Sequence, residues 1–109
     1  AEKRTYEIAE VSGKLKAVAD DTRVAVVALA QLNRENEKDK ARAPRLTDLA
    51  DSGQIERDAD LVLLLDRVRN EPKGEAIIAI AKQRDGECGI VPLWYEGQFC
   101  RFSDPSPIF

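Results

Sequence analysis

Two basic residues flank a glutamine near position 83 and could bind a phosphate group. Lys82, Gln83 and Arg84 directly follow the apolar run at 76–81. If that run is a strand, its alternation places the side chains of Lys82 and Arg84 on one face and that of Gln83 on the other. Arginine offers a planar fork of donors and lysine a point charge, so the pair suits a phosphate. The alternative is a solvated strand end whose cations pair with nearby carboxylates.

The other two apolar runs of the chain also end in polar residues. Gln31 follows the run at 24–30, and Asp66 and Arg67 follow the run at 61–65. Ligands of open α/β sheets bind beyond the C-terminal ends of the strands, so these positions are candidates for a binding site. The alternative is that the chain is polar here because it emerges from a buried strand into water.

The segment at 48–56 contains a turn that could bind an anion. Thr47 is expected to cap a short helix through Asp51, and Gly53 is placed to end it. Free backbone amides at the Ser52-Gly53 turn could bind an anion such as a DNA phosphate. The alternative interpretation is an ordinary helix end.

The loop at 32–45 carries charges of both signs. Its cations are Arg34, Lys38, Lys40, Arg42 and Arg45, and acidic residues interleave with them. A contact with nucleic acid is one interpretation of this pattern, and a solvated loop is the other.

The composition excludes several kinds of site. The chain has no histidine, which excludes a Ser-His-Asp triad, a Cys-His pair and any histidine-containing metal site within it. Cys88 and Cys100 are too far apart for a metal knuckle, so no metal site is expected and both are interpreted as free thiols. A net charge of −3 is not that of a protein that binds nucleic acid through bulk charge, so any such contact must be local.

The overall composition predicts one soluble domain. The chain has 109 residues, of which 43% are hydrophobic and 34% charged. No apolar run reaches the roughly 18 residues that cross a membrane. Two cysteines are too few for a disulfide framework, which favours a reducing cytosol. Methionine is absent even at position 1, so we expect a processed product or a piece of a longer protein.

The elements that position these residues are predicted to be a helix and buried strands. Apolar residues recur three and four apart over 6–20, which predicts an amphipathic helix. A further helical turn or a tight connection into the next strand is expected at 55–60. The runs at 24–30, 61–65 and 76–81 lack alternation, which is typical of strands buried on both faces of a parallel sheet. This pattern predicts an α/β fold.

The last third of the chain predicts an antiparallel meander. Two β-prone segments lie at 90–95 and 99–102, and Pro92 places the first at a sheet edge or beside a bulge. One long and one short helix are too few to cover three buried strands. We therefore expect the missing layers to belong to residues that are not present here.

Taken in chain order, these segments resemble the C-terminal half of the RecA-like motor domain of the DnaB family of replicative DNA helicases. Three blocks in the family's order carry the resemblance: Ala-Leu-Ala-Gln-Leu-Asn-Arg at 28–34, Leu-Thr-Asp-Leu at 46–49 with Asp-Ser-Gly-Gln-Ile-Glu-Arg-Asp-Ala-Asp-Leu-Val-Leu at 51–63, and Ile-Ala-Lys-Gln-Arg-Asp-Gly at 80–86. The middle block also fits the RadA group. The joint presence of Gln-Leu-Asn-Arg and Lys-Gln-Arg-Asp-Gly favours the helicase.

The resemblance implies the C-terminal portion of a RecA-like P-loop ATPase core that works with ATP and Mg²⁺. It implies that Gln31 senses the γ-phosphate of ATP. It also implies that Lys82, Gln83 and Arg84 contact the nucleotide held by a neighbouring subunit. Arg84 would then be the arginine finger that stabilises charge during phosphoryl transfer.

The resemblance also implies contacts with single-stranded DNA. Ala50, Asp51 and Gly53, together with Arg34, would touch the DNA backbone in the central channel of a hexameric ring. A primase and a helicase loader are the implied protein partners. The implied location is the cytoplasm of a bacterium or phage-infected cell, in association with the nucleoid.

The sequence departs from the family pattern in several places. Ala50 stands where the family commonly has an arginine, Arg57 where glutamine is usual, and Glu87-Cys88 replaces a pair that often begins with proline. A divergent phage or prophage member is expected. The sequence has no Gly-x-x-x-x-Gly-Lys-Ser/Thr loop and no acidic Walker B strand. Residues 1–109 are therefore expected to be a partial domain that does not hydrolyse ATP alone.

Two other functions remain open from the sequence. One is a non-catalytic, truncated relative that docks onto a full-length ring as an interaction module. The other is a fragment of a RecA-type or RadA-type recombination ATPase. A Walker A motif in the upstream coding sequence would favour the motor over the interaction module.

Overall fold

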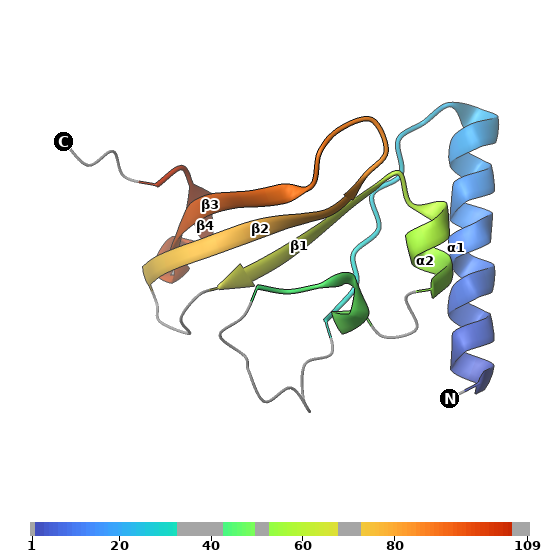
Figure 1. Ribbon diagram of the computed structural model, residues 1–109, viewed down its shortest axis with the longest axis horizontal. Coiled ribbons are helices and arrows are strands. Elements are labelled where there is room, and N and C mark those ends of the chain that lie inside the picture. Colours follow the sequence, from blue (N-terminus) through green and yellow to red (C-terminus); the bar gives the residue numbers. More distant parts are fainter. Residues whose placement is uncertain (1, 33–42, 50–52, 68–72, 106–109) are drawn as a thin grey trace. The chain divides into compact units, whose positions relative to one another are not determined.

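The structure is a computed structural model, and it describes residues 2–32, 43–49, 53–67 and 73–105 (Figure 1). Contacts divide the chain into two compact units. One contains Ala1–Asn36 and Leu46–Asp60, and the other contains Glu37–Arg45 and Leu61–Phe109.

The first unit is built on helix α1, which spans Glu2–Thr22. The helix predicted at 6–20 is therefore confirmed and is longer at both ends. Glu10 and Lys14 form an ion pair of 3.0 Å one turn apart on its surface. The helix ends where Arg23 adopts a left-handed conformation with φ of 57°.

The strand predicted at 24–30 is wrong. This segment has no regular secondary structure, and its apolar side chains are exposed, with Val27 at 86% and Leu29 at 95%. A strand forms only beside a partner that satisfies its backbone groups. Among the described residues, the backbone pairing nearest to this segment along the chain is a single antiparallel bridge between Leu32 and Leu49. The apolar pattern alone therefore gave a strand that has no partner here.

Gly53 begins a helix instead of ending one, which corrects the prediction of a helix end at this residue. A 3-10 helix, η1, spans Leu46–Asp48, and helix α2 spans Gly53–Asp58. No glycine among the described residues has a positive φ, so Gly53 does not take the left-handed conformation of a terminal glycine. Of the two structures predicted at 55–60, a helical turn or a tight connection, α2 shows the helical turn, which ends at Asp58.

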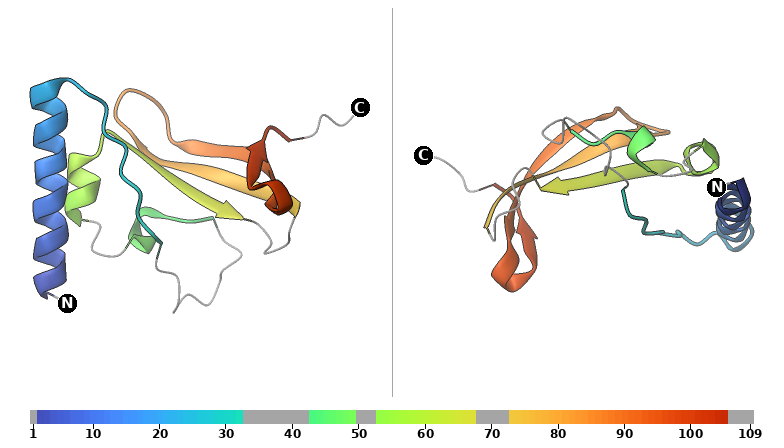
Figure 2. Two further views of the ribbon diagram at one scale, coloured as in Figure 1. Left: turned by 180° about the vertical axis from the view of Figure 1, so that it is seen from behind. Right: turned by 90° about the horizontal axis from the view of Figure 1, so that it is seen from below.

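The second unit is an antiparallel sheet in which the strands follow one another in chain order (Figures 1 and 2). Its strands are β1 (Leu61–Arg67), β2 (Lys73–Gln83), β3 (Gly89–Glu96) and β4 (Arg101–Ser103). A short 3-10 helix, η2, spans Gly97–Phe99 between β3 and β4. The predicted C-terminal meander is therefore confirmed.

The pairing of β1 with β2 corrects the expectation of parallel strands. The two strands run antiparallel, with Leu63 opposite Ile80 and a register shift between Val62 and Leu63. Only residues 68–72 connect them, and a parallel crossover needs about a dozen residues or more. The length of the connection therefore decides the direction of pairing.

Burial along β1 alternates, although its sequence does not. Val62 and Leu64 are buried, whereas Leu61, Leu63 and Leu65 on the opposite face are about half exposed. The prediction that this strand is buried on both faces is thus wrong for the part of the chain that the structure describes. On β2, Ala76 and Ala79 are also buried.

Pro92 lies on β3 at a point that the short strand β4 does not reach. It stands opposite Ile77 of β2, while β4 pairs only with residues 94–96 of β3. The prediction of a sheet edge at Pro92 is confirmed for the described residues, because a proline lacks the amide proton that a second neighbour needs. Further along, the rings of Tyr95 and Phe102 pack 4.5 Å apart across β3 and β4.

Candidate functional site

The three polar residues predicted to meet a phosphate lie at the end of β2. Lys82 is half-buried and stands opposite Val62, and Gln83 is the last residue of the strand. Arg84 is exposed and lies in the turn that follows. The alternation argument therefore applies to Lys82 but not to Arg84, because the chain leaves the strand before position 84.

The turn after β2 is closed by contacts from Gln83. The side-chain Nε2 of Gln83 donates a hydrogen bond of 2.9 Å to the backbone oxygen of Glu87. The amide of Gly86 donates to the backbone oxygen of Gln83 at 3.4 Å. Arg84 lies between these anchoring points, in the connection drawn in orange between β2 and β3 (Figure 1).

Gln31 belongs to the first unit, whereas Lys82, Gln83 and Arg84 belong to the second. Its side chain is exposed, and it is followed by Leu32, which forms a bridge with Leu49. This bridge ties the end of the extended segment to the residue that follows η1.

Among the residues predicted to contact DNA, Ala50, Asp51 and Arg34 lie outside the described residues. Gly53 is described, and it is the exposed first residue of α2. Among the described residues, the nearest atom to a Cβ added there is a guanidinium nitrogen of Arg57, at 4.0 Å.

Polar contacts hold α2 against α1, and the sequence predictions missed them. Ser12 Oγ donates to Asp58 Oδ2 at 2.8 Å, and Gln54 Nε2 donates to Asp58 Oδ1 at 3.1 Å. The hydrogen bond from Ser12, followed by that from Gln54, lowers the pKa of Asp58 below its ordinary value of 3.8. None of residues 3–22 or of α2 is buried, so these contacts join two helices whose interface is open to water.

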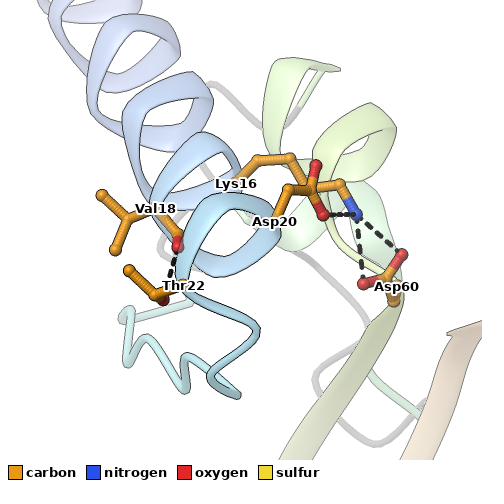
Figure 3. Close-up of polar contacts among 5 residues, drawn as sticks. All are labelled: Lys16, Val18, Asp20, Thr22 and Asp60. Atoms are coloured by element: carbon orange, nitrogen blue, oxygen red, sulfur yellow. Dashed lines mark hydrogen bonds and ion pairs between the residues drawn. The ribbon is translucent and has the colours of Figure 1, made fainter.

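Lys16 adds a second link one turn further along α1. Its Nζ lies 3.1 and 3.2 Å from the two carboxylate oxygens of Asp60 and 3.8 Å from Asp20 of the same helix (Figure 3). Near the end of α1, Thr22 Oγ1 donates to the backbone oxygen of Val18 at 2.6 Å. Ser12 and Lys16 are four residues apart, which is the sequence signal that could have placed both on the helix face toward α2.

The described residues offer no metal site and no membrane-spanning helix. They hold no group of three or more histidine, cysteine or acidic residues placed to bind a metal ion. Cys88 and Cys100 are exposed and free, as predicted. In the same part of the chain, no helix is both long and apolar enough to span a membrane.

Comparison with known families decides the classification. The model of the DnaB-like helicase C-terminal domain matches residues 1–104. The chain belongs to this family. Curated relatives agree, and the "Replicative DNA helicase DnaB" of Pasteurella multocida is 49% identical over 95% of the chain. The protein of the same description from Leifsonia xyli is 42% identical over 98%.

Solved structures show the same fold. One is an ATPase domain with a TM-score of 0.81 and 37% identity, covering 94% of this chain and 38% of that one. Another is a DnaB-like replicative helicase described with its interactions with primase, with a TM-score of 0.80 and 38% identity. It covers 92% of this chain and 26% of that one. The predicted fold class, the C-terminal portion of an α/β RecA-like ATPase core, is confirmed.

The chain spans about a quarter of the length of the curated relatives it matches, 23% for the protein from Pasteurella multocida and 24% for that from Leifsonia xyli. Within the described residues, the segment at 24–30 and one face of β1 leave apolar side chains exposed.

Proposed function

We propose that this chain forms the C-terminal part of an ATP-driven, ring-forming replicative DNA helicase motor. The observation that carries the proposal is the placement of Lys82 and Arg84 in a chain of this family. Lys82 stands at the end of a paired strand, and Arg84 is exposed on the turn beyond it. An exposed arginine on a braced turn suits contact with a nucleotide in a neighbouring subunit.

In this proposal the cations act on the phosphates of a bound nucleotide. ATP with Mg²⁺ supplies the phosphoryl group when bound. Lys82 and Arg84 fit phosphate oxygens by their chemistry, and Arg84 would stabilise the charge that develops in the transition state. Gln31 would report the state of the γ-phosphate to the residues that follow it. The sequence lacks the glycine-rich phosphate loop, so we assign Mg²⁺ and most ATP contacts to residues outside this chain.

The DNA contacts belong to the other unit. We assign backbone contacts with single-stranded DNA to Gly53 at the start of α2, together with Ala50, Asp51 and Arg34. Such contacts bind phosphates and carry no sequence information. A hexameric ring around the strand, a primase and a helicase loader complete the proposed assembly, and DNA stimulation of ATP turnover is its expected property.

Replacing Arg84 tests the nucleotide role. In the full-length protein, Arg84→Ala is expected to reduce DNA-stimulated ATP hydrolysis by about 10³-fold or more, because the transition-state charge loses its partner. Equilibrium binding of a labelled nucleotide should stay close to that of the wild type, since the phosphate cradle is elsewhere. Steady-state hydrolysis and nucleotide titration measure the two effects.

Arg101→Ala is the matched control, because Arg101 is another exposed arginine of the same unit and pairs with Glu96 at 2.6 Å. Its turnover should remain near the wild-type rate. Arg84→Lys separates charge from shape, since lysine keeps the charge but lacks the planar fork, and it should remain strongly impaired. Normal turnover in Arg84→Ala would remove the finger assignment.

A further inference from the structure

Gln83 makes two hydrogen bonds across the turn that carries Arg84, one through its side chain and one through its backbone. Gln83 uses its side-chain Nε2 to donate to the backbone oxygen of Glu87, at 2.9 Å. Its own backbone oxygen accepts from the amide of Gly86, at 3.4 Å. Only the nitrogen of a glutamine amide can donate to a carbonyl, so this contact fixes which way the amide faces.

Gly86 provides the space in which the Gln83 side chain lies. A Cβ at position 86 would stand 2.5 Å from Gln83 Nε2, 2.7 Å from its Cδ and 3.1 Å from its Cγ. The φ of Gly86 is not positive, so an alanine could adopt this backbone conformation. The glycine is therefore required for the close approach of the side chain and not for the conformation of the turn.

We propose that Gln83 is a positioning residue, which holds the turn so that Arg84 reaches its target, and that Gly86 is its necessary counterpart. The proposal rests on the proposed role of Arg84. The contact with Glu87 uses one N–H of the Gln83 amide. The expectation that Gln83 also contacts the nucleotide stays a prediction of the family resemblance, because the amide keeps a second N–H and its oxygen.

The physical reason for such a brace is the exposure of the turn. Residues 84–90 are all exposed, so packing does not fix the path of the backbone there. An arginine that must meet a transferring phosphate loses much of its effect when it is misplaced by about 1 Å. Hydrogen bonds across the turn narrow the positions that the Arg84 backbone can take, and so the positions that its guanidinium reaches.

The test uses the full-length protein at saturating single-stranded DNA. In Gln83→Ala and in Gly86→Ala, kcat for ATP hydrolysis is expected to fall about tenfold, with KM for ATP within about twofold of the wild type. Glu87→Ala is the matched control, because it removes a side chain from the same turn but keeps the backbone oxygen that accepts from Gln83. Its kcat should be unchanged.

Two further variants make the result specific. The double variant Gln83→Ala with Gly86→Ala should lose no more than either single variant, since the side chain that Gly86 accommodates is already gone. Gln83→Glu keeps the shape but offers no donor to the Glu87 oxygen, so it should match Gln83→Ala. Circular dichroism shows whether Gln83→Ala folds. If it does not fold, Gln83→Glu takes its place as the variant that lacks the hydrogen bond to Glu87.

The outcomes separate this inference from the proposed function. Wild-type kcat in the Gln83 variants, additive losses in the double variant, or a raised KM with unchanged kcat would each overturn the positioning role. If these occur while Arg84→Ala is inactive, the function proposed for Arg84 stands. If Arg84→Ala itself turns over normally, the proposed function fails first.

Discussion

Asp58 is the residue whose environment links the two helices of the first unit. Hydrogen bonds from Ser12 and Gln54 favour its charged form and lower its pKa. A group of this kind contributes stability that is present above its unfolded pKa and is lost as the pH falls through its folded pKa. The contact between α1 and α2 is therefore expected to weaken in acid.

Replacing Ser12 tests this dependence. The thermal midpoint of the full-length wild-type protein should exceed that of Ser12→Ala at neutral pH, because the variant loses the main cause of the pKa shift. The margin should shrink below pH 3.8, the ordinary pKa of the carboxyl, as Asp58 takes up its proton. Melting curves over an acid series measure the margin, and one that is independent of pH would contradict the account.

The site residues differed in how far the sequence could place them. The order Lys82, Gln83, Arg84 pointed to phosphate chemistry, and the structure puts Lys82 and Gln83 at the end of β2 and Arg84 in the turn beyond it. The sequence could not show that the strand stops at Gln83. The strand ends there because a turn follows it. The Gln83 side chain closes this turn with a hydrogen bond to the backbone oxygen of Glu87, and it has room to do so because Gly86 carries no Cβ.

At the scale of elements, α1 contains a glycine that its structure does not need. A Cβ at Gly13 would meet no atom within 4 Å, and its φ is not positive. Gly13→Ala should therefore raise the free energy of unfolding by about 0.5–1 kcal/mol, because alanine loses less backbone freedom in a helix.

Urea unfolding of the full-length protein measures this gain. Gly86→Ala is the contrasting glycine substitution, because a Cβ there would meet the Gln83 side chain, and it should give no such gain. A loss of stability in Gly13→Ala would mean that α1 packs more closely at this position than the structure shows.

Elements with local signals were predictable and those that depend on partners were not. The spacing of Ile8, Val11 and Leu15 predicted α1. Glycine-containing turns beside β-prone residues predicted β3 and the turn toward β4. The run at 24–30 has an equally clear apolar pattern but forms no strand. Strand pairing depends on hydrogen bonds to other segments, and a run of valines does not reveal where those segments are.

At the scale of the whole molecule, the described residues leave much apolar surface exposed. Leu61, Leu63 and Leu65 expose about half of their surface, and Val27 and Leu29 expose nearly all of theirs. Soluble proteins rarely leave such apolar surface uncovered. The chain spans 23% of the curated relative from Pasteurella multocida and 38% of the solved ATPase domain whose fold it shares.

The most direct test of the central claim is unwinding of a forked DNA duplex by the full-length protein. With ATP and Mg²⁺, the wild-type protein is expected to separate the strands, and Arg84→Ala is expected to leave the duplex intact while still binding nucleotide. The strand separation is followed by fluorescence of a labelled strand. Absence of ATP-dependent unwinding in the wild type would favour a non-catalytic interaction module, and preference for a joint molecule over the fork would favour a recombination ATPase. Either result would contradict the assignment of this chain to a replicative helicase motor.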